Sequence, residues 1–207
     1  MATFAAAAET SGASSSTFPS TVRGKLDRAE AIRIKGGERY AAKKYKSAVR
    51  QYAQIPAWVS PFAVPAGGDP TAAYGEMMGQ GGKAVHTKAE QLEAQTLMRI
   101  AHQNSAMCYV KMKDGARALA SCEKAFKYDD GSMWKVHRTR AHAYILLRDL
   151  DEAQAALDKV TALIAEDPEL SAKTEDKITK KLEILLKKMF AQHEKRERKK
   201  YKNAFGV

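Results

Sequence analysis

The feature that most constrains this chain is a pair of small residues, twelve positions apart, that occurs three times. The pairs are Gly36 with Ala48, Ala106 with Ala118, and Ala141 with Ala153, and the residues four positions further on are Tyr52, Cys122 and Leu157. Two antiparallel helices approach closely only where small side chains face each other, and a larger side chain of the second helix fills the gap to the next pair. The pattern therefore predicts three helix hairpins, each with a short turn between its helices.

The spacing of the pairs also reveals an insertion. The second and third pairs start 35 residues apart, close to a helical-repeat period of about 34, whereas the first and second start 70 apart. The extra segment, residues 56–93, contains four prolines and two glycine groups, which break helices and strands. We expect a loop there. Its aromatic residues would either dock a partner or fold back on the repeats.

These patterns predict an all-α superhelix of three helix-turn-helix repeats, closed by a basic helix. The repeats are expected at residues 26–55, 94–129 and 132–167, within a domain that spans 26–170. In the segment 171–207, apolar residues recur at intervals of three and four; they are Ile178, Leu182, Leu185, Leu186, Met189 and Phe190. This spacing predicts a helix whose apolar face caps the last repeat and whose basic end projects into solvent.

The composition of the chain indicates the state of its N-terminal segment, its cellular location and the role of its cysteines. Residues 1–25 are rich in Ala, Ser and Thr with few large apolar side chains, which predicts a disordered tail. Their shortage of acidic residues also fits an organellar targeting segment, the less favoured alternative. The chain lacks an apolar run of about 18 residues and a hydrophobic secretory signal, so the expected location is the cytoplasm. The two cysteines, Cys108 and Cys122, are expected in the core of a reduced protein.

The chain is strongly basic. Lys and Arg number 35 against 24 Asp and Glu, which gives a net charge of +11. This charge favours acidic peptides, nucleic acid or anionic membrane surfaces as partners. The run from Lys180 to Lys202 offers a second reading, as an element that binds nucleic acid, a membrane surface or a calmodulin-like protein. Interleaved glutamates dilute that run, and its apolar face is needed for the cap, so peptide binding is the leading hypothesis.

The sequence does not indicate an enzyme. It contains no glycine-rich phosphate loop between a strand and a helix, no paired-histidine metal motif and no nucleophile elbow. The histidines, at positions 86, 102, 137, 142 and 193, lack metal-ligand spacing and are expected in or on helices. We therefore expect no catalytic residue, metal or cofactor. The oligomeric state stays open.

Several stretches, taken together, resemble a known family. They are Lys35-Gly36-Gly37-Glu38-Arg39-Tyr40, Asn104-Ser105-Ala106-Met107-Cys108-Tyr109-Val110-Lys111, Arg148-Asp149-Leu150-Asp151-Glu152-Ala153 and Lys200-Tyr201-Lys202-Asn203-Ala204-Phe205. From Leu26 to Val207 the chain resembles the tetratricopeptide-repeat (TPR) domains of the large FK-binding immunophilins and, more closely, the tetratricopeptide repeat protein 9 family. The resemblance implies a TPR superhelix that binds other proteins. Immunophilins carry a separate catalytic isomerase domain, for which this chain has no room.

The resemblance also implies candidate binding residues. Many such TPR domains hold the acidic C-terminal tail of a heat-shock chaperone in a carboxylate clamp of five side chains. Arg33, Asn104 and Lys135 match three clamp positions, whereas Gly37 and Thr139 replace the other Asn and the Arg. Charge-assisted hydrogen bonds to a carboxylate are strong, so two missing donors would weaken this clamp.

We predict a co-chaperone-like adaptor, a scaffold that binds an acidic or mixed peptide in its concave groove. The predicted peptide-binding residues are Arg33, Gln103, Asn104, Met107, Lys111, Lys135, Arg138 and His142. For each of them the alternative is a side chain that merely keeps the groove hydrated.

Overall fold

A computed structural model describes residues 19–64, 86–128, 133–166 and 177–205 of the chain. Within these ranges every regular element is an α-helix and no strand is found, which confirms the expected all-α fold. None of the described helices is both long enough and apolar enough to cross a membrane.

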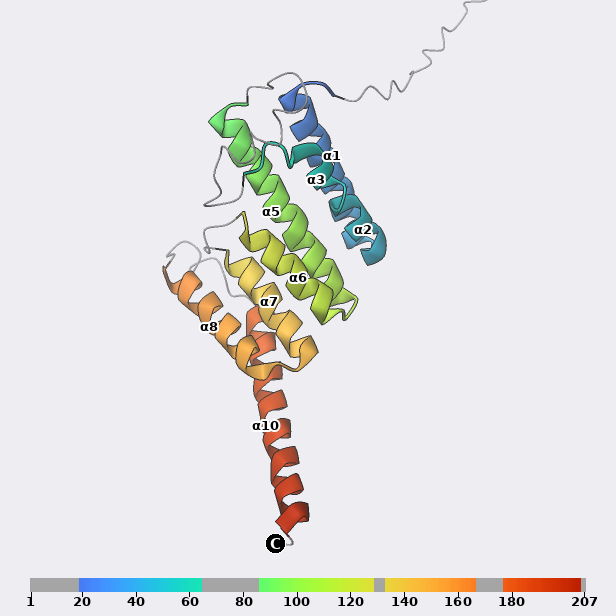
Figure 1. The fold of residues 1–207 in the computed structure, drawn as a ribbon. Helices are drawn as coiled ribbons and strands as arrows, with labels where there is room; N and C mark the ends of the chain where they lie inside the picture. Colours follow the sequence, from blue (N-terminus) through green and yellow to red (C-terminus); the bar gives the residue numbers. More distant parts are fainter. Residues whose placement is uncertain (1–18, 65–85, 129–132, 167–176, 206–207) are drawn as a thin grey trace, which may run out of the picture.

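The helices form three hairpins that stack side by side (Figure 1). The hairpins are α1 (Val22–Ala41) with α2 (Tyr45–Tyr52), α5 (Lys88–Lys111) with α6 (Gly115–Phe126), and α7 (Trp134–Leu147) with α8 (Leu150–Glu166). The first helices of the hairpins, α1, α5 and α7, contact one another in that order. This arrangement agrees with the predicted superhelix, in which the first helices of successive hairpins share one face.

The small residues lie where the hairpins close. Gly36, Ala48, Ala106, Ala118, Ala141 and Ala153 are all buried. Tyr52, Cys122 and Leu157, four positions after each second alanine, are buried as well. The twelve-residue spacing therefore marks close helix contacts, as predicted from the sequence.

Each hairpin turn contains a residue in the left-handed backbone region. These residues are Lys43, Lys113 and Arg148, with φ angles of 59°, 60° and 65°. A left-handed residue lets the chain reverse after a helix, and glycine takes this conformation without steric cost. In this chain, three residues that carry side chains adopt this conformation instead of glycine. In the second turn, the Asp114 carboxylate accepts a hydrogen bond from the Arg117 backbone N–H and so caps α6 (3.0 Å).

The prediction of a loop over residues 56–93 is wrong at both ends of that range, which are helical. A short helix, α3 (Ile55–Val59), continues the first hairpin, and α5 already starts at Lys88. Pro56 is tolerated because it occupies the first turn of α3, where its missing N–H breaks no helical bond. Ile55, Val59 and Phe62 are buried in the core with residues of α1 and α5. The middle of the predicted loop, residues 65–85, lies outside the described residues.

The first helix also begins earlier than predicted. It starts at Val22, within the segment expected to be a disordered tail, because Val22 and Leu26 are both buried against the first core cluster. The Thr21 hydroxyl caps this helix by accepting a hydrogen bond from the Gly24 backbone N–H (3.1 Å). Most of the predicted tail, residues 1–18, lies outside the described residues.

The last helix, α10 (Lys177–Phe205), packs against α7 and α8 and then extends away from the hairpins (Figure 1). Leu182 and Leu186 are buried between them, with Met189 and Phe190 partly buried beside them, as expected of a capping helix. Leu185 differs from the prediction, because its side chain is 40% exposed and does not join the capping face. The side chain of Ile178 lies outside what the structure describes.

Candidate functional site

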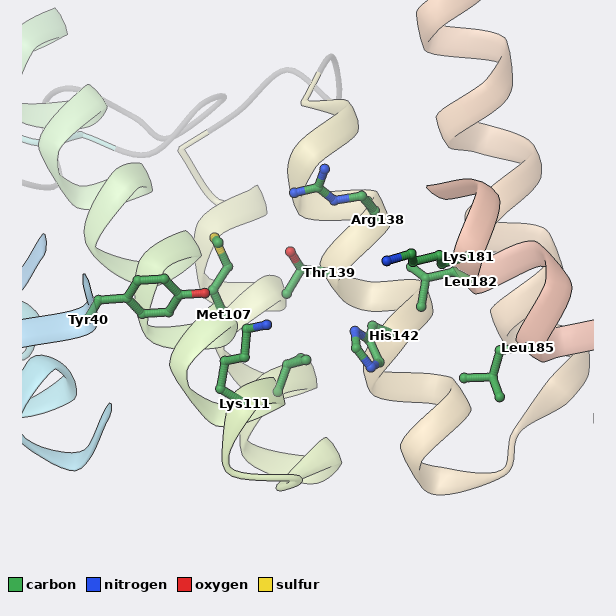
Figure 2. A pocket seen from close by; sticks show the side chains of 10 residues that line it. Tyr40, Met107, Lys111, Arg138, Thr139, His142, Lys181, Leu182 and Leu185 are labelled. Atoms are coloured by element: carbon green, nitrogen blue, oxygen red, sulfur yellow. The ribbon is translucent and has the colours of Figure 1, made fainter. Parts of the chain in front are cut away.

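A cavity of about 380 Å³ opens between four helices on the face shared by the first helix of each hairpin. Figure 2 shows its lining side chains. They come from α1 (Tyr40), α5 (Met107, Val110 and Lys111), α7 (Arg138, Thr139 and His142) and α10 (Lys181, Leu182 and Leu185). The cavity thus combines apolar walls with basic groups.

Half of the predicted peptide-binding residues meet at this cavity. Met107 and Lys111 are four positions apart on α5, as are Arg138 and His142 on α7. Residues at this spacing lie on one helix face, so each helix presents a pair to the same space. The geometry therefore brings together Met107, Lys111, Arg138 and His142.

The cavity is electrostatically positive. Lys111, Arg138 and Lys181 line it from three different helices. Burial lowers the pKa of His142, and the neighbouring charges of Lys111 and Arg138 lower it further. His142 is therefore neutral at pH 7, and an anion placed among these groups would favour its protonation.

Arg33 lies apart from the cavity and already has a carboxylate partner. Its guanidinium donates to both carboxylate oxygens of Glu30, from Nε at 2.6 Å and from Nη2 at 2.5 Å. This pairing raises the pKa of Arg33 and lowers that of Glu30. An incoming carboxylate would have to compete with Glu30 for this guanidinium.

The two polar residues predicted on the middle of α5 are also absent from the cavity wall. The Asn104 side chain hydrogen-bonds to Tyr52 on α2, while burial is the main cause of the raised pKa of Tyr52. Gln103 is buried, with 9% of its surface exposed. Asn104 thus ties the first hairpin to the second, and Gln103 is a residue of the interior.

Lys135 stands one turn before Arg138 and is exposed. The Lys135 Nζ lies 5.6 Å from the centre of the Trp134 ring, and the Arg138 guanidinium lies 5.1 Å from the same ring. Cations over an aromatic face are held by its quadrupole. Trp134 therefore holds both cations near the start of α7, and Lys135 is not among the residues that line the cavity.

The two clamp positions that depart from the family pattern offer no replacement donor. Gly37 is exposed and has no side chain, and the buried Thr139 hydroxyl donates to the Lys135 carbonyl at 2.9 Å. Arg140, next to Thr139, turns toward α6. Its guanidinium donates to the Tyr144 hydroxyl at 3.1 Å and pairs with Glu123 at 3.5 Å. Arg140 is therefore directed away from the cavity.

Six of the residues that line the cavity were not among the predicted peptide-binding residues: Tyr40, Val110, Thr139, Lys181, Leu182 and Leu185. Tyr40 and Val110 follow the same helical spacing as the predicted residues and could have been found by it. The three residues on α10 could not, because their position depends on how the last helix docks onto α7 and α8. Among the described residues, no cluster of three His, Cys, Asp or Glu side chains could hold a metal ion.

Comparison with known proteins agrees with the fold. A family model described as tetratricopeptide repeat matches residues 109–174. The human peptidyl-prolyl cis-trans isomerase FKBP4 is 27% identical over 139 residues, covering 67% of this chain and 26% of the human protein. The bovine FKBP4 is 26% identical over 184 residues, covering 87% of this chain and 33% of its own. The chain thus spans between a quarter and a third of the length of these relatives.

Solved structures show the same architecture. The C-terminal TPR-containing domain of a Plasmodium falciparum FK506-binding protein has a TM-score of 0.57 and 17% identity, over 84% of this chain and 96% of that domain. The first TPR domain of human RPAP3 has a TM-score of 0.50 and 17% identity, over 80% of this chain and 98% of that domain. The chain therefore has the fold of these TPR domains, and part of it resembles the sequences of FK-binding immunophilins.

Proposed function

We propose that this chain is a non-catalytic adaptor that binds an acidic peptide of a partner protein in its concave groove. The observation that carries this proposal is the convergence of Lys111, Arg138 and Lys181 on one partly apolar cavity. Stacked helical repeats form extended concave surfaces of the kind that accommodate a peptide. Positive charge on such a surface favours peptides that contain Asp or Glu and speeds their encounter with the groove.

The mixed lining of the cavity favours a peptide over a simple anion. Its volume of about 380 Å³ is within the range of about 300–1,000 Å³ that is usual for ligand pockets. Met107 and Leu185 supply apolar contacts, and Lys111, Arg138 and Lys181 line the same cavity. A peptide with acidic and apolar side chains would satisfy both parts of this surface.

The acidic C-terminal tail of a heat-shock chaperone is our candidate occupant, as the resemblance to immunophilin TPR domains implies. The clamp for such a tail is incomplete at Gly37 and Thr139. Each missing charge-assisted bond would cost about 1.5–3 kcal/mol, so we expect weaker binding than in a complete clamp. We place this adaptor in the cytoplasm, where such partners are found and where the thiols of Cys108 and Cys122 would stay reduced.

A second candidate site is the basic part of α10, which extends beyond the hairpins. Lys187, Lys188, Lys195 and Arg196 are exposed there. They would neutralise phosphates of nucleic acid or an anionic membrane surface, with affinity that falls steeply as salt increases. Glu194 pairs with Arg198 at 2.5 Å and lowers the net charge of this surface, so we rank this candidate below the groove.

The test is a fluorescence-anisotropy titration of the full chain with a labelled acidic chaperone-tail peptide at two salt concentrations. Saturable binding that Lys135→Glu weakens would support the chaperone-tail form of the proposal. Binding that survives Lys135→Glu but is lost in Arg138→Glu would keep the adaptor and move its centre into the cavity. An unlabelled single-stranded RNA that competes equally well would instead favour the basic part of α10.

A further inference from the structure

We infer that α10 completes the peptide groove and that its residues Lys181 and Leu185 select a partner segment in which an acidic side chain adjoins a large apolar one. This inference rests on the proposed function and specifies the chemistry of the partner. It assigns a binding role to a helix whose only predicted contribution to the repeats was to cap them.

Two buried leucines fix the position of α10. Leu182 and Leu186 are buried against α7 and α8, with exposed fractions of 4% and 1%, so they fix this part of the helix on the last hairpin. That anchoring places Lys181 and Leu185 on the side of α10 that faces the cavity. Figure 2 shows the Lys181 side chain extending from α10 toward α7, on the opposite side of the cavity from Lys111 and Tyr40.

The cavity presents positive charge from three helices. None of the described residues that line the cavity is acidic, whereas Lys111, Arg138 and Lys181 contribute a cation each from α5, α7 and α10. A carboxylate among them gains charge-assisted hydrogen bonds, which are about twice as strong as neutral ones. Lys181 thus adds a cation that the clamp positions of the family do not include.

Leu185 gives the α10 side of the cavity an exposed apolar surface. Leu185 keeps 40% of its surface exposed although it lines the same cavity as the apolar side chains of Met107 and Val110. A large apolar side chain of a partner would cover this surface and remove it from water. Because Lys181 and Leu185 are four positions apart on one helix face, the acidic and apolar groups of the partner must also be close neighbours.

The acidic group is assigned to a side chain of the partner and not to its terminal carboxylate. A single terminal carboxylate requires several donors held in fixed geometry. The residues at the corresponding positions of the first two hairpins do not supply them, because Arg33 is paired with Glu30, Gly37 has no side chain and Asn104 bonds to Tyr52. The cations around the cavity instead suit carboxylates repeated along a segment.

The experiment uses the full chain and a fluorescein-labelled octapeptide of alternating Glu and Leu, amidated at its C-terminus. Lys181→Glu is compared with Lys188→Glu, an equal charge change at an exposed position two turns further along α10 and outside the cavity wall. We expect Lys181→Glu to raise the Kd about tenfold or more, and Lys188→Glu to raise it less than about twofold. Lys181 and Lys188 are both exposed, so both variants should keep the melting temperature of the parent. Lys181→Met, which removes the positive charge without adding a negative one, should also raise the Kd.

Three changes to the peptide complete the test. Replacing Leu by Ala, or Glu by Gln, should each weaken binding by about tenfold, whereas a free C-terminus should leave it unchanged within about twofold. Equal losses in Lys181→Glu and Lys188→Glu would overturn the inference, as would binding that is indifferent to Leu or that requires the free C-terminus. If the parent protein binds neither this peptide nor the chaperone-tail peptide, the proposed function itself fails.

Discussion

The ring of Tyr52 lies directly over Gly36, in the space where any other residue would carry a side chain. A Cβ atom built on Gly36 would lie 2.8 Å from Cδ1 of Tyr52, closer than real Cβ atoms approach another atom. The ring also hydrogen-bonds through its hydroxyl to Asn104 of the next hairpin. Gly36 is thus required because α1 must leave room for the residue that links the first two repeats.

Gly36→Ala is expected to destabilise the protein, against the usual preference of helices for Ala. The methyl group would displace the Tyr52 ring, and overpacking of this kind costs about 1–3 kcal/mol. Gly37→Ala is the matched control, because its Cβ would have nothing within 4 Å and Ala should stabilise the helix by about 0.5–1 kcal/mol. Thermal unfolding followed by circular dichroism measures both, and a stabilised Gly36→Ala variant would contradict this packing.

The left-handed turn residues predict a stabilising substitution. Lys113 has a φ of 60°, a conformation that costs a residue with a side chain about 1–2 kcal/mol relative to glycine. Lys113→Gly should therefore raise the free energy of unfolding, by up to about 1 kcal/mol after the greater flexibility of unfolded glycine is subtracted. Lys35→Gly, at an exposed position within α1, should lower it by a similar amount. Chemical denaturation of the two variants should give opposite signs; the same sign in both would contradict the prediction.

The two thiols should be unreactive in the folded protein. Burial raises the pKa of Cys108 and of Cys122 to about 12 from an ordinary value of 9.0. Since the thiolate is the reactive form, dithionitrobenzoate at pH 8 should label the native protein at least about 100-fold more slowly than the unfolded chain. Ser60→Cys introduces an exposed control thiol and should react at the unfolded rate. Rapid labelling of a parent thiol would show that the core around it opens readily.

The lowered pKa of His142 predicts how peptide affinity depends on pH. In the free protein its pKa is lowered by burial and by Lys111 and Arg138, and Lys181 faces the same cavity. A bound carboxylate would raise this pKa, so binding takes up a proton and becomes tighter as the pH falls through the ordinary histidine range near 6.5. We expect affinity for the alternating peptide to be about three- to tenfold higher at pH 5.5 than at pH 7.5.

His142→Gln is the control for this pH dependence. It should flatten the profile between pH 5.5 and 7.5, where the carboxylates of the peptide stay ionised. A profile that persists in His142→Gln would assign the proton to another group, and affinity that falls on acidification of the parent would contradict the predicted sign.

The hairpins were predictable because the spacing of Gly36 and Ala48 and of its two counterparts records direct helix contacts. Met107 and Lys111 are four positions apart, a spacing that puts both on one helix face without knowledge of the tertiary structure. The cavity wall on α10 was not predictable, because the docking of Lys181 and Leu185 depends on contacts with helices distant in sequence. Nor does the sequence show that Arg33 and Asn104 already have partners, or that Arg140 turns toward α6.

The position of the bound peptide shows whether the cavity is the binding site. We would titrate the isotope-labelled full chain with the amidated peptide of alternating Glu and Leu and follow amide and side-chain shifts by NMR. We expect the largest shifts at residues 107–111, 138–142 and 181–185, which include residues that line the cavity. Shifts confined to residues 187–198, in the part of α10 beyond the hairpins, would contradict it and locate binding on the basic helix.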